Sequence, residues 1–407
     1  MTDYCARCDF VIELARRLHQ GGSTAPRLED VVNAIGRRLG LDVHIWSSPT
    51  AIIATIRPQD AQGETQAVTR VVRLEPGDIH LRRLWRYDDI ASRVVSGELS
   101  PAAGMAALDA AARPDSTRRQ WLESVFGYLL ASAGVAGLLK GSVADIASAG
   151  AMGLILGVLA QLACGRPRVA ATFDALAAFL VALLSAWIAH AWTPISPLVL
   201  TAGLIVLLPG LTLTTAAAEV ATGHLVSGTA RFAGAVAVLL KLAFGALVGS
   251  RLAAALGWQP LPVLSHSNPV WLQPAALLVS AAAFALLFRA RIRDGWVVCL
   301  AAITSYVSSQ LAITAMGAEL GLFTAASVVT VLSNVYARSA NRPGATFRLP
   351  GLILLVPGSV GFKSLTFVFE KDVFLGLDTA FSVVTLVAAL VAGLLFGNSL
   401  VPPRKGM

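Results

Sequence analysis

The chain has 407 residues, of which 56% are hydrophobic and 14% are charged, and its mean hydropathy is +0.69. A soluble globular protein carries about 25% charged residues, so this composition excludes a chain that is soluble throughout. The formal net charge of +8 does not require nucleic acid, because membrane proteins collect Arg and Lys in their cytoplasmic loops. We therefore expect a lipid bilayer as a partner and no nucleic acid.

The charges are concentrated in the N-terminal part of the chain. Residues 1–119 contain 16 Arg, 15 Asp or Glu and no Lys. From Trp121 onward, apolar runs of about 18–25 residues follow, each long enough to cross ~30 Å of hydrocarbon. We predict a cytoplasmic domain at 1–119, a first membrane repeat at 120–260 and a second at 261–407.

The first of these segments has the pattern of a small α+β domain. Apolar residues at helical spacing predict helices at 10–19 and 28–39, each followed by glycine. Strands are expected at 43–46, 51–56 and 67–74, helical spacing returns between 79 and 94, and Ser100-Pro101 begins a helix that runs to 112.

This segment contains no motif that predicts chemistry. It has no P-loop, no G-x-G-x-x-G and no G-x-S-x-G, and Cys5 and Cys8 form one C-x-x-C without a second pair or a histidine at zinc spacing. We assign no catalytic residues, no metal and no cofactor.

The rest of the chain predicts an α-helical polytopic membrane protein. We expect ten spans in two groups of five, at 121–139, 143–164, 171–192, 198–220, 230–250, 270–288, 295–313, 317–337, 348–369 and 374–398.

The two groups are related by an internal repeat. The octapeptide from Gly203 to Gly210 recurs from Gly351 to Gly358 with six identical residues and an offset of 148, and the same offset relates the two groups of spans. Because five is odd, the second group enters the membrane from the opposite side, which predicts an inverted-topology repeat. Arginine is abundant in the even-numbered loops and scarce in the others, so both termini are expected in the cytoplasm.

Each repeat contains a membrane helix interrupted by Pro-Gly. Proline breaks or kinks the helix, and a half-helix that begins at mid-membrane presents N–H groups suited to a carboxylate. We expect a binding site for a small molecule there. Its predicted residues are Pro209, Gly210, Thr212 and Thr214 in the first repeat, and Pro357, Gly358, Ser359 and Lys363 in the second.

Lys241 lies in the middle of a span, where an ionisable group is costly and is a functional candidate. We add it to the substrate-binding residues. Asp174 and Glu219 are the candidates for pairing with it or for carrying protons. The residue that corresponds to Lys241 in the second repeat is Ala389, so this charge is not repeated.

The Pro-Gly segments and their surroundings resemble a known family, the threonine/serine exporters (ThrE). In the first half, Leu208-Pro209-Gly210, residues 223–228 and Arg231 are similar to its signature, although His224 stands where family members commonly carry an acidic residue. The remaining similar stretches are 336–338, Pro343, 356–358 and Gly393 in the second half, and 14–22, 31–40 and 99–112 in the N-terminal domain.

The resemblance implies a secondary transporter that exports threonine and serine across the inner membrane, driven by the proton-motive force. Split members of the family are linked to succinate export, so a dicarboxylate is the alternative substrate. A membrane-anchored enzyme with its active site in residues 1–119 and a regulatory membrane protein are the alternatives of other classes. The oligomeric state is left open, including a homo-oligomer.

Overall fold

A three-stranded antiparallel sheet organises the N-terminal domain of the computed structural model, which describes residues 2–59, 67–113, 117–261, 268–340 and 342–403. The strands are β1 (Leu41–Ser48), β2 (Ala51–Pro58) and β3 (Val68–Arg73), in the order β1-β2-β3. A two-residue turn fixes the first hairpin, so that Ser48 pairs with Ala51 and Leu41 with Pro58. Alternate residues of β1 and β2 therefore point to one face, and that face is buried.

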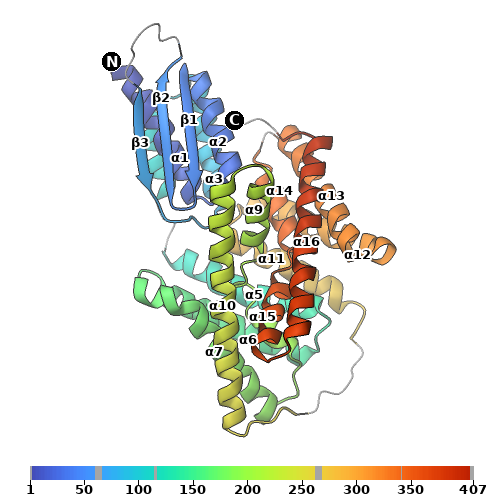
Figure 1. Cartoon of the computed structure of the whole chain (residues 1–407). Helices are drawn as coiled ribbons and strands as arrows, with labels where there is room; N and C mark the ends of the chain where they lie inside the picture. The colour runs from blue at the N-terminus through green and yellow to red at the C-terminus, as the bar shows by residue number, and fades with distance from the viewer. Residues whose placement is uncertain (1, 60–66, 114–116, 262–267, 341, 404–407) are drawn as a thin grey trace.

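Helices cover the buried face of this sheet (Figure 1). They are α1 (Thr2–Gln20), α2 (Ala25–Arg38), α3 (Leu81–Val95) and α4 (Pro101–Ala112). The apolar stripe of α2 consists of Leu28, Val31, Val32 and Ile35, at the spacing of one helix face.

The predicted elements of this domain all occur, with one large difference in length. Helix α1 begins at Thr2 rather than at residue 10, because its first turns are held from outside: the Tyr4 hydroxyl donates to the Ile56 carbonyl at 3.1 Å and Cys8 is buried. The Ser100 hydroxyl accepts from the Ala103 N–H, as the predicted N-cap requires.

The remainder of the chain is helical. Its elements are α5 (Thr117–Leu138), α6 (Val143–Ala163), α7 (Pro167–Ala191), α8 (Leu198–Gly203), α9 (Gly210–Ala221), α10 (Leu225–Ala255), α11 (Leu272–Leu287), η1 (Ile292–Asp294), α12 (Gly295–Met316), α13 (Ala318–Ser339), α14 (Ala345–Ile353), α15 (Gly358–Phe369) and α16 (Val373–Leu400).

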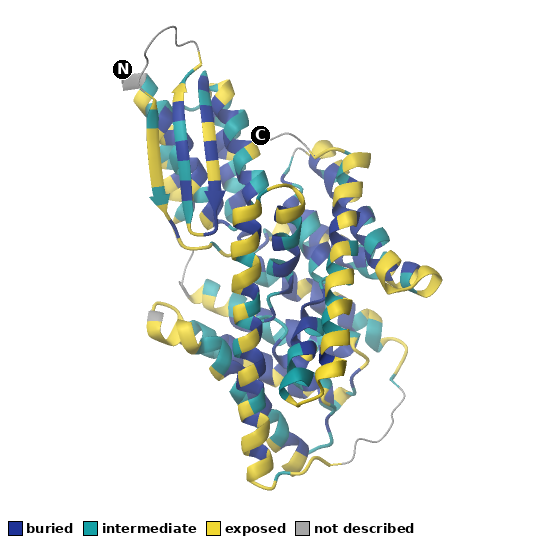
Figure 2. Ribbon diagram, viewed as in Figure 1, coloured by how far each residue is buried: buried dark blue, intermediate teal, exposed yellow. Residues whose placement is uncertain are grey.

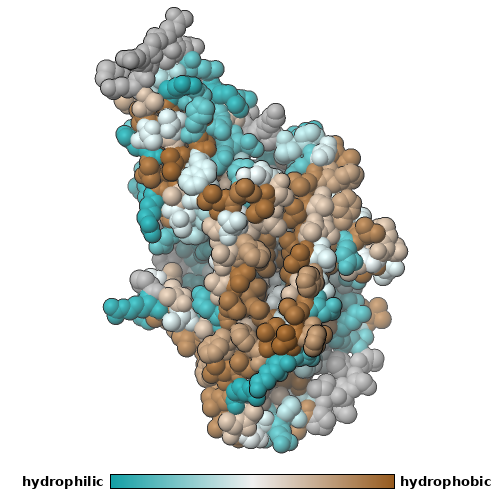
Figure 3. All heavy atoms as spheres, viewed as in Figure 1, coloured by the Kyte–Doolittle hydropathy of each residue, from teal (hydrophilic) through white to brown (hydrophobic). Residues whose placement is uncertain are grey.

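Within the described residues, eight helical segments are long and apolar enough to cross a membrane. The two predicted spans that do not reach this length are α11, with 16 residues, and the segment of α8 and α9, which is interrupted between Gly203 and Gly210. The outer faces of α10 and α16 carry large exposed apolar side chains, such as Phe244 and Phe381 (Figures 2 and 3). These faces are suited to contact with lipid.

Residues 148 positions apart make equivalent contacts. Gly245 and Gly249 bring α10 close to the α7 backbone at Ala175 and Phe179, and Gly393 and Gly397 do the same for α16 on α13. Contacts between the halves are reciprocal as well: α5 packs on α11, while α9 contacts α16 and α15 contacts α10.

The N-terminal domain is docked on the end of the helical domain at which α9 and α14 lie (Figure 1). Leu81 is buried with Phe288 and is packed near Leu349 of α14, and the Leu81 N–H donates to the Phe288 carbonyl at 3.0 Å. The domain therefore covers the C-terminal end of α9 and the start of α14, two helices that adjoin the Pro-Gly segments.

Candidate functional site

The two Pro-Gly segments break their helices in the same way. Helices α9 and α15 each begin at the glycine, and the preceding prolines have nearly identical backbone angles, φ −80° and ψ 39° at Pro209 and φ −82° and ψ 37° at Pro357. Proline has no N–H to continue the helix in the N-terminal direction. The sequence prediction of two broken helices is confirmed.

The two breaks meet in space. A Cβ atom built on Gly358 would lie 2.9 Å from the Gly210 Cα and 3.1 Å from its nitrogen, and one built on Gly210 would lie 3.0 Å from the Gly358 Cα. These distances are shorter than real Cβ contacts, so the close approach of the two backbones depends on glycine at both positions. Residues 148 apart in the sequence thus form one contact.

This contact joins two positive helix ends. Each helix N-terminus has the effect of about +0.5 charge, and neither α9 nor α15 has a side chain that caps it. Two uncapped N-termini side by side repel each other and attract an anion. A carboxylate placed beside the Gly210–Gly358 contact would accept hydrogen bonds from the N–H groups of both helix ends.

The hydroxyl groups near the breaks differ in their surroundings. Thr214 is 2% exposed and its Oγ1 has no hydrogen-bond partner within the described part of the chain. A buried unpaired hydroxyl is costly, so Thr214 is a strong candidate for a polar ligand. Thr212 and Ser359 are half-buried near the same helix starts, whereas Lys363 is exposed on α15.

Lys241 is paired with Asp174. The Lys241 Nζ donates to Asp174 Oδ2 at 2.6 Å, joining the middle of α10 to α7. The Lys241 side chain is 40% exposed and that of Asp174 is 20% exposed. Both side chains are therefore partly exposed, and the pair lies one turn from Gly245, where the α7 backbone at Ala175 approaches α10 closely.

Glu219 has a different environment, at the junction with the N-terminal domain. Its carboxylate is 1% exposed and accepts from the Ala25 N–H at 3.0 Å, from the Ser227 hydroxyl at 2.7 Å and from Arg231 Nε at 3.1 Å. Glu219 thus pairs with Arg231 and not with Lys241, and it binds α9 to the first turn of α2.

Comparison with known families identifies the family of the chain. A model of threonine/serine exporters, ThrE, matches residues 9–253. A second model, described as Threonine/Serine exporter, ThrE, matches residues 273–400. The chain belongs to the threonine/serine exporter family. No curated protein and no solved structure matches it.

This exporter-family protein is a multi-pass membrane transporter. Both halves of the family pattern are present in one chain, which confirms the resemblance read from the sequence. The first match extends over the N-terminal domain and the α9–α10 junction, and the second covers α14 and α15.

Sequence reasoning missed the contact between His224 and the N-terminal domain in this exporter. His224 Nε2 lies 3.3 Å from Glu29 Oε2, and Glu29 Oε1 accepts from the Ser47 N–H at 2.7 Å. Burial raises the pKa of the Glu29 carboxyl. The only available clue was that His224 departs from the acidic residue of the family pattern, and this clue did not identify a partner about 195 residues away in the chain.

Proposed function

We propose that the protein exports threonine and serine across the inner membrane and that the proton-motive force drives the export. The observation that carries this proposal is the meeting of two uncapped helix N-termini at Gly210 and Gly358, beside the unpaired hydroxyl of Thr214. Threonine and serine carry the two groups that this arrangement lacks, a carboxylate and a hydroxyl.

The proposed topology has ten spans in two inverted repeats, with both termini in the cytoplasm. The equivalent glycine contacts and the reciprocal packing of α9 on α16 and α15 on α10 support it. The broken segments then count as one span each, and their breaks lie near the middle of the bilayer. The N-terminal domain lies on the cytoplasmic side.

In the proposed binding mode, the N–H groups at the starts of α9 and α15 hold the substrate carboxylate. Thr214 exchanges a hydrogen bond with the side-chain hydroxyl of the substrate. Thr212 and Ser359 accept from the ammonium group. Because the glycines already touch in this conformation, the substrate lies beside their contact and not between them.

The Asp174–Lys241 pair is the proposed site of proton coupling. A proton that binds to Asp174 neutralises its carboxylate and breaks the ion pair with Lys241. The electrostatic attraction between α7 and α10 therefore depends on the protonation state of Asp174. Glu219 and Arg231 are proposed to act in docking the N-terminal domain.

The N-terminal domain is proposed to gate the cytoplasmic access route. It is held to α9 by Glu219 and to the α9–α10 turn by His224. Helix α9 has its other end at the proposed substrate site, 12 residues or about 18 Å away. A movement of the domain is therefore transmitted to the site through one rigid helix.

Counterflow of labelled threonine, serine, alanine and succinate in proteoliposomes, with and without an imposed pH gradient, tests the proposal. We expect threonine and serine to exchange, alanine to compete weakly, and the gradient to accelerate uptake into the compartment that gives up protons in exchange. Exchange of succinate alone would assign the protein to dicarboxylate transport. Thr214→Val is expected to weaken threonine and serine more than alanine, and an equal loss for all three would exclude this hydroxyl as the group that reads the side chain.

A further inference from the structure

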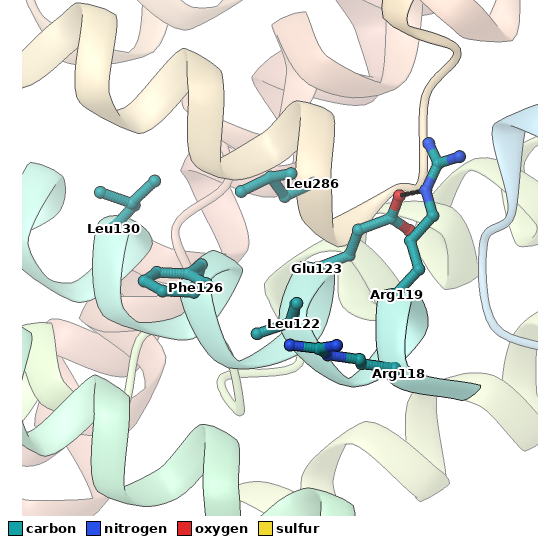
Figure 4. Close-up of a pocket in the computed structure, with 7 residues that line it drawn as sticks. All are labelled: Arg118, Arg119, Leu122, Glu123, Phe126, Leu130 and Leu286. Atoms are coloured by element: carbon teal, nitrogen blue, oxygen red, sulfur yellow. Dashed lines mark hydrogen bonds and ion pairs between the residues drawn. The ribbon is translucent and has the colours of Figure 1, made fainter. Parts of the chain in front are cut away.

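A groove lies between α5 and α11 at the start of the first predicted span (Figure 4). Its volume is about 550 Å³, and Leu286 of α11 faces the α5 side chains across it. The lining is polar at one end and apolar along the rest, and consists of Arg118, Arg119, Leu122, Glu123, Phe126, Leu130 and Leu286.

The α5 side of the groove is a single stripe. Arg118, Leu122, Phe126 and Leu130 follow each other at intervals of four residues, which places them on one face of the helix. The stripe is about 18 Å long at 1.5 Å per residue. The apolar part of the stripe, from Leu122 to Leu130, is about 12 Å long. One leaflet of a bilayer has about 15 Å of hydrocarbon, so this part fits within a single leaflet when Arg118 is at the level of the headgroups.

The polar end of the groove has an excess of positive charge. Glu123 Oε1 accepts from Arg119 Nε at 2.8 Å and from Arg82 of the N-terminal domain at 3.2 Å, so one carboxylate is shared by two guanidinium groups. The Arg118 side chain makes no hydrogen bond or ion pair with any residue that the structure describes. The cluster therefore has charge available for an external anion.

We propose that this groove binds an anionic phospholipid of the cytoplasmic leaflet. The phosphate accepts from Arg118 and Arg119, and one acyl chain lies along Leu122, Phe126 and Leu130 with Leu286 against its other side. A soluble phosphate would leave the apolar stripe uncovered, and a zwitterionic lipid would leave the excess positive charge uncompensated. Basic pockets between membrane helices on the cytoplasmic side are typical sites for anionic headgroups.

The site is independent of the transported substrate, and its binding is measured directly. The full-length protein in mild detergent is titrated with phosphatidylglycerol or phosphatidylcholine, and bound lipid is counted by native mass spectrometry. We expect phosphatidylglycerol to bind with a lower Kd than phosphatidylcholine. Each arginine near an anionic surface contributes about fivefold in affinity, so Arg118→Gln should weaken phosphatidylglycerol about fivefold and Arg118→Gln/Arg119→Gln about thirtyfold.

The matched control is Arg166→Gln/Arg168→Gln. These two exposed arginines also precede a predicted span but line no part of this groove, so the double control should bind phosphatidylglycerol like the unmodified protein. Equal losses in the two double variants, or equal binding of phosphatidylcholine and phosphatidylglycerol, would overturn the proposal. Displacement of the lipid by soluble glycerol phosphate at equal concentration would also overturn it, because the acyl chain would then contribute nothing. Arg118→Gln removes no side-chain hydrogen bond or ion pair of the described residues, so its effect on binding is separable from folding.

Discussion

Adding one methyl group at Gly358 tests whether the contact between the two broken helices is part of the transport cycle. The Cβ of Gly358→Ala would lie 2.9 Å from the Gly210 Cα and 3.1 Å from the Gly210 nitrogen. Both are backbone atoms, so no change of rotamer can relieve the overlap. The helices α9 and α15 have to move apart at their N-termini.

Overpacking of this kind costs about 1–3 kcal/mol. At 1.36 kcal/mol per factor of ten, the conformation with touching helix ends becomes about 5- to 150-fold less populated. If the protein passes through this conformation in each cycle, threonine counterflow falls by a similar factor, while the amount of protein in the membrane is unchanged.

Gly234→Ala is the matched control, because a Cβ at this position of α10 meets no atom within 4 Å. Initial rates of labelled threonine counterflow are compared at equal reconstituted protein, together with the melting temperature of each variant. Transport by Gly358→Ala at the rate of Gly234→Ala would refute the argument and would make the breaks simple kinks.

Three further predictions follow from other contacts. Lys241→Met should abolish proton-driven transport, and proton-driven uptake by this variant would contradict the coupling role. Combining Lys241→Met with Asp174→Asn should raise the expression level above that of the single variant, because no charge is then left unpaired in the membrane. Glu219→Gln keeps the side-chain volume but removes the carboxylate that pairs with Arg231 and accepts from the Ala25 N–H at the start of α2. The rate of amide hydrogen exchange in the first turns of α2 should therefore rise at least tenfold, and an unchanged rate would exclude a docking role. Burial lowers the pKa of His19, so the unfolded chain binds a proton at this residue more readily than the folded domain does. The free energy of unfolding of the N-terminal domain should therefore decrease as the pH falls below the ordinary histidine pKa of about 6.5. The melting temperature should therefore drop more between pH 7.5 and 5.5 in the unmodified protein than in His19→Gln, and equal drops would rule out this residue as the cause.

The fold was largely predictable because its determinants are local or repeated. Apolar periodicity gave the strands and helices of the N-terminal domain, and the octapeptide repeat located both helix breaks. The ends of α1 and α10 were not predicted. Helix α10 extends from Leu225 to Ala255, beyond the apolar run, because its polar N-terminal turns contact Glu219 and the N-terminal domain.

The site was predictable only in part. Pro209, Gly210, Pro357 and Gly358 are marked by their repetition, and the structure brings the two glycines together. Pair partners were harder to assign, because which carboxylate faces a given cation depends on helix packing and not on sequence spacing. Asp174 reaches Lys241, while the other acidic candidate is bound to Arg231 and the N-terminal domain.

The ion pair between α7 and α10 breaks the likeness of the two halves. The positions that correspond to Asp174 and Lys241 in the second half are occupied by Leu322 and Ala389, which carry no charge. In the proposed inverted repeat, the inward-open and outward-open states are produced by exchange of the conformations of the two halves. With identical halves these states would have equal free energies. Because only one half carries the charge pair, the free energies of the two states are unequal. The affinity for substrate therefore differs between the two sides of the membrane, as suits a transporter that binds its substrate on one side and releases it on the other.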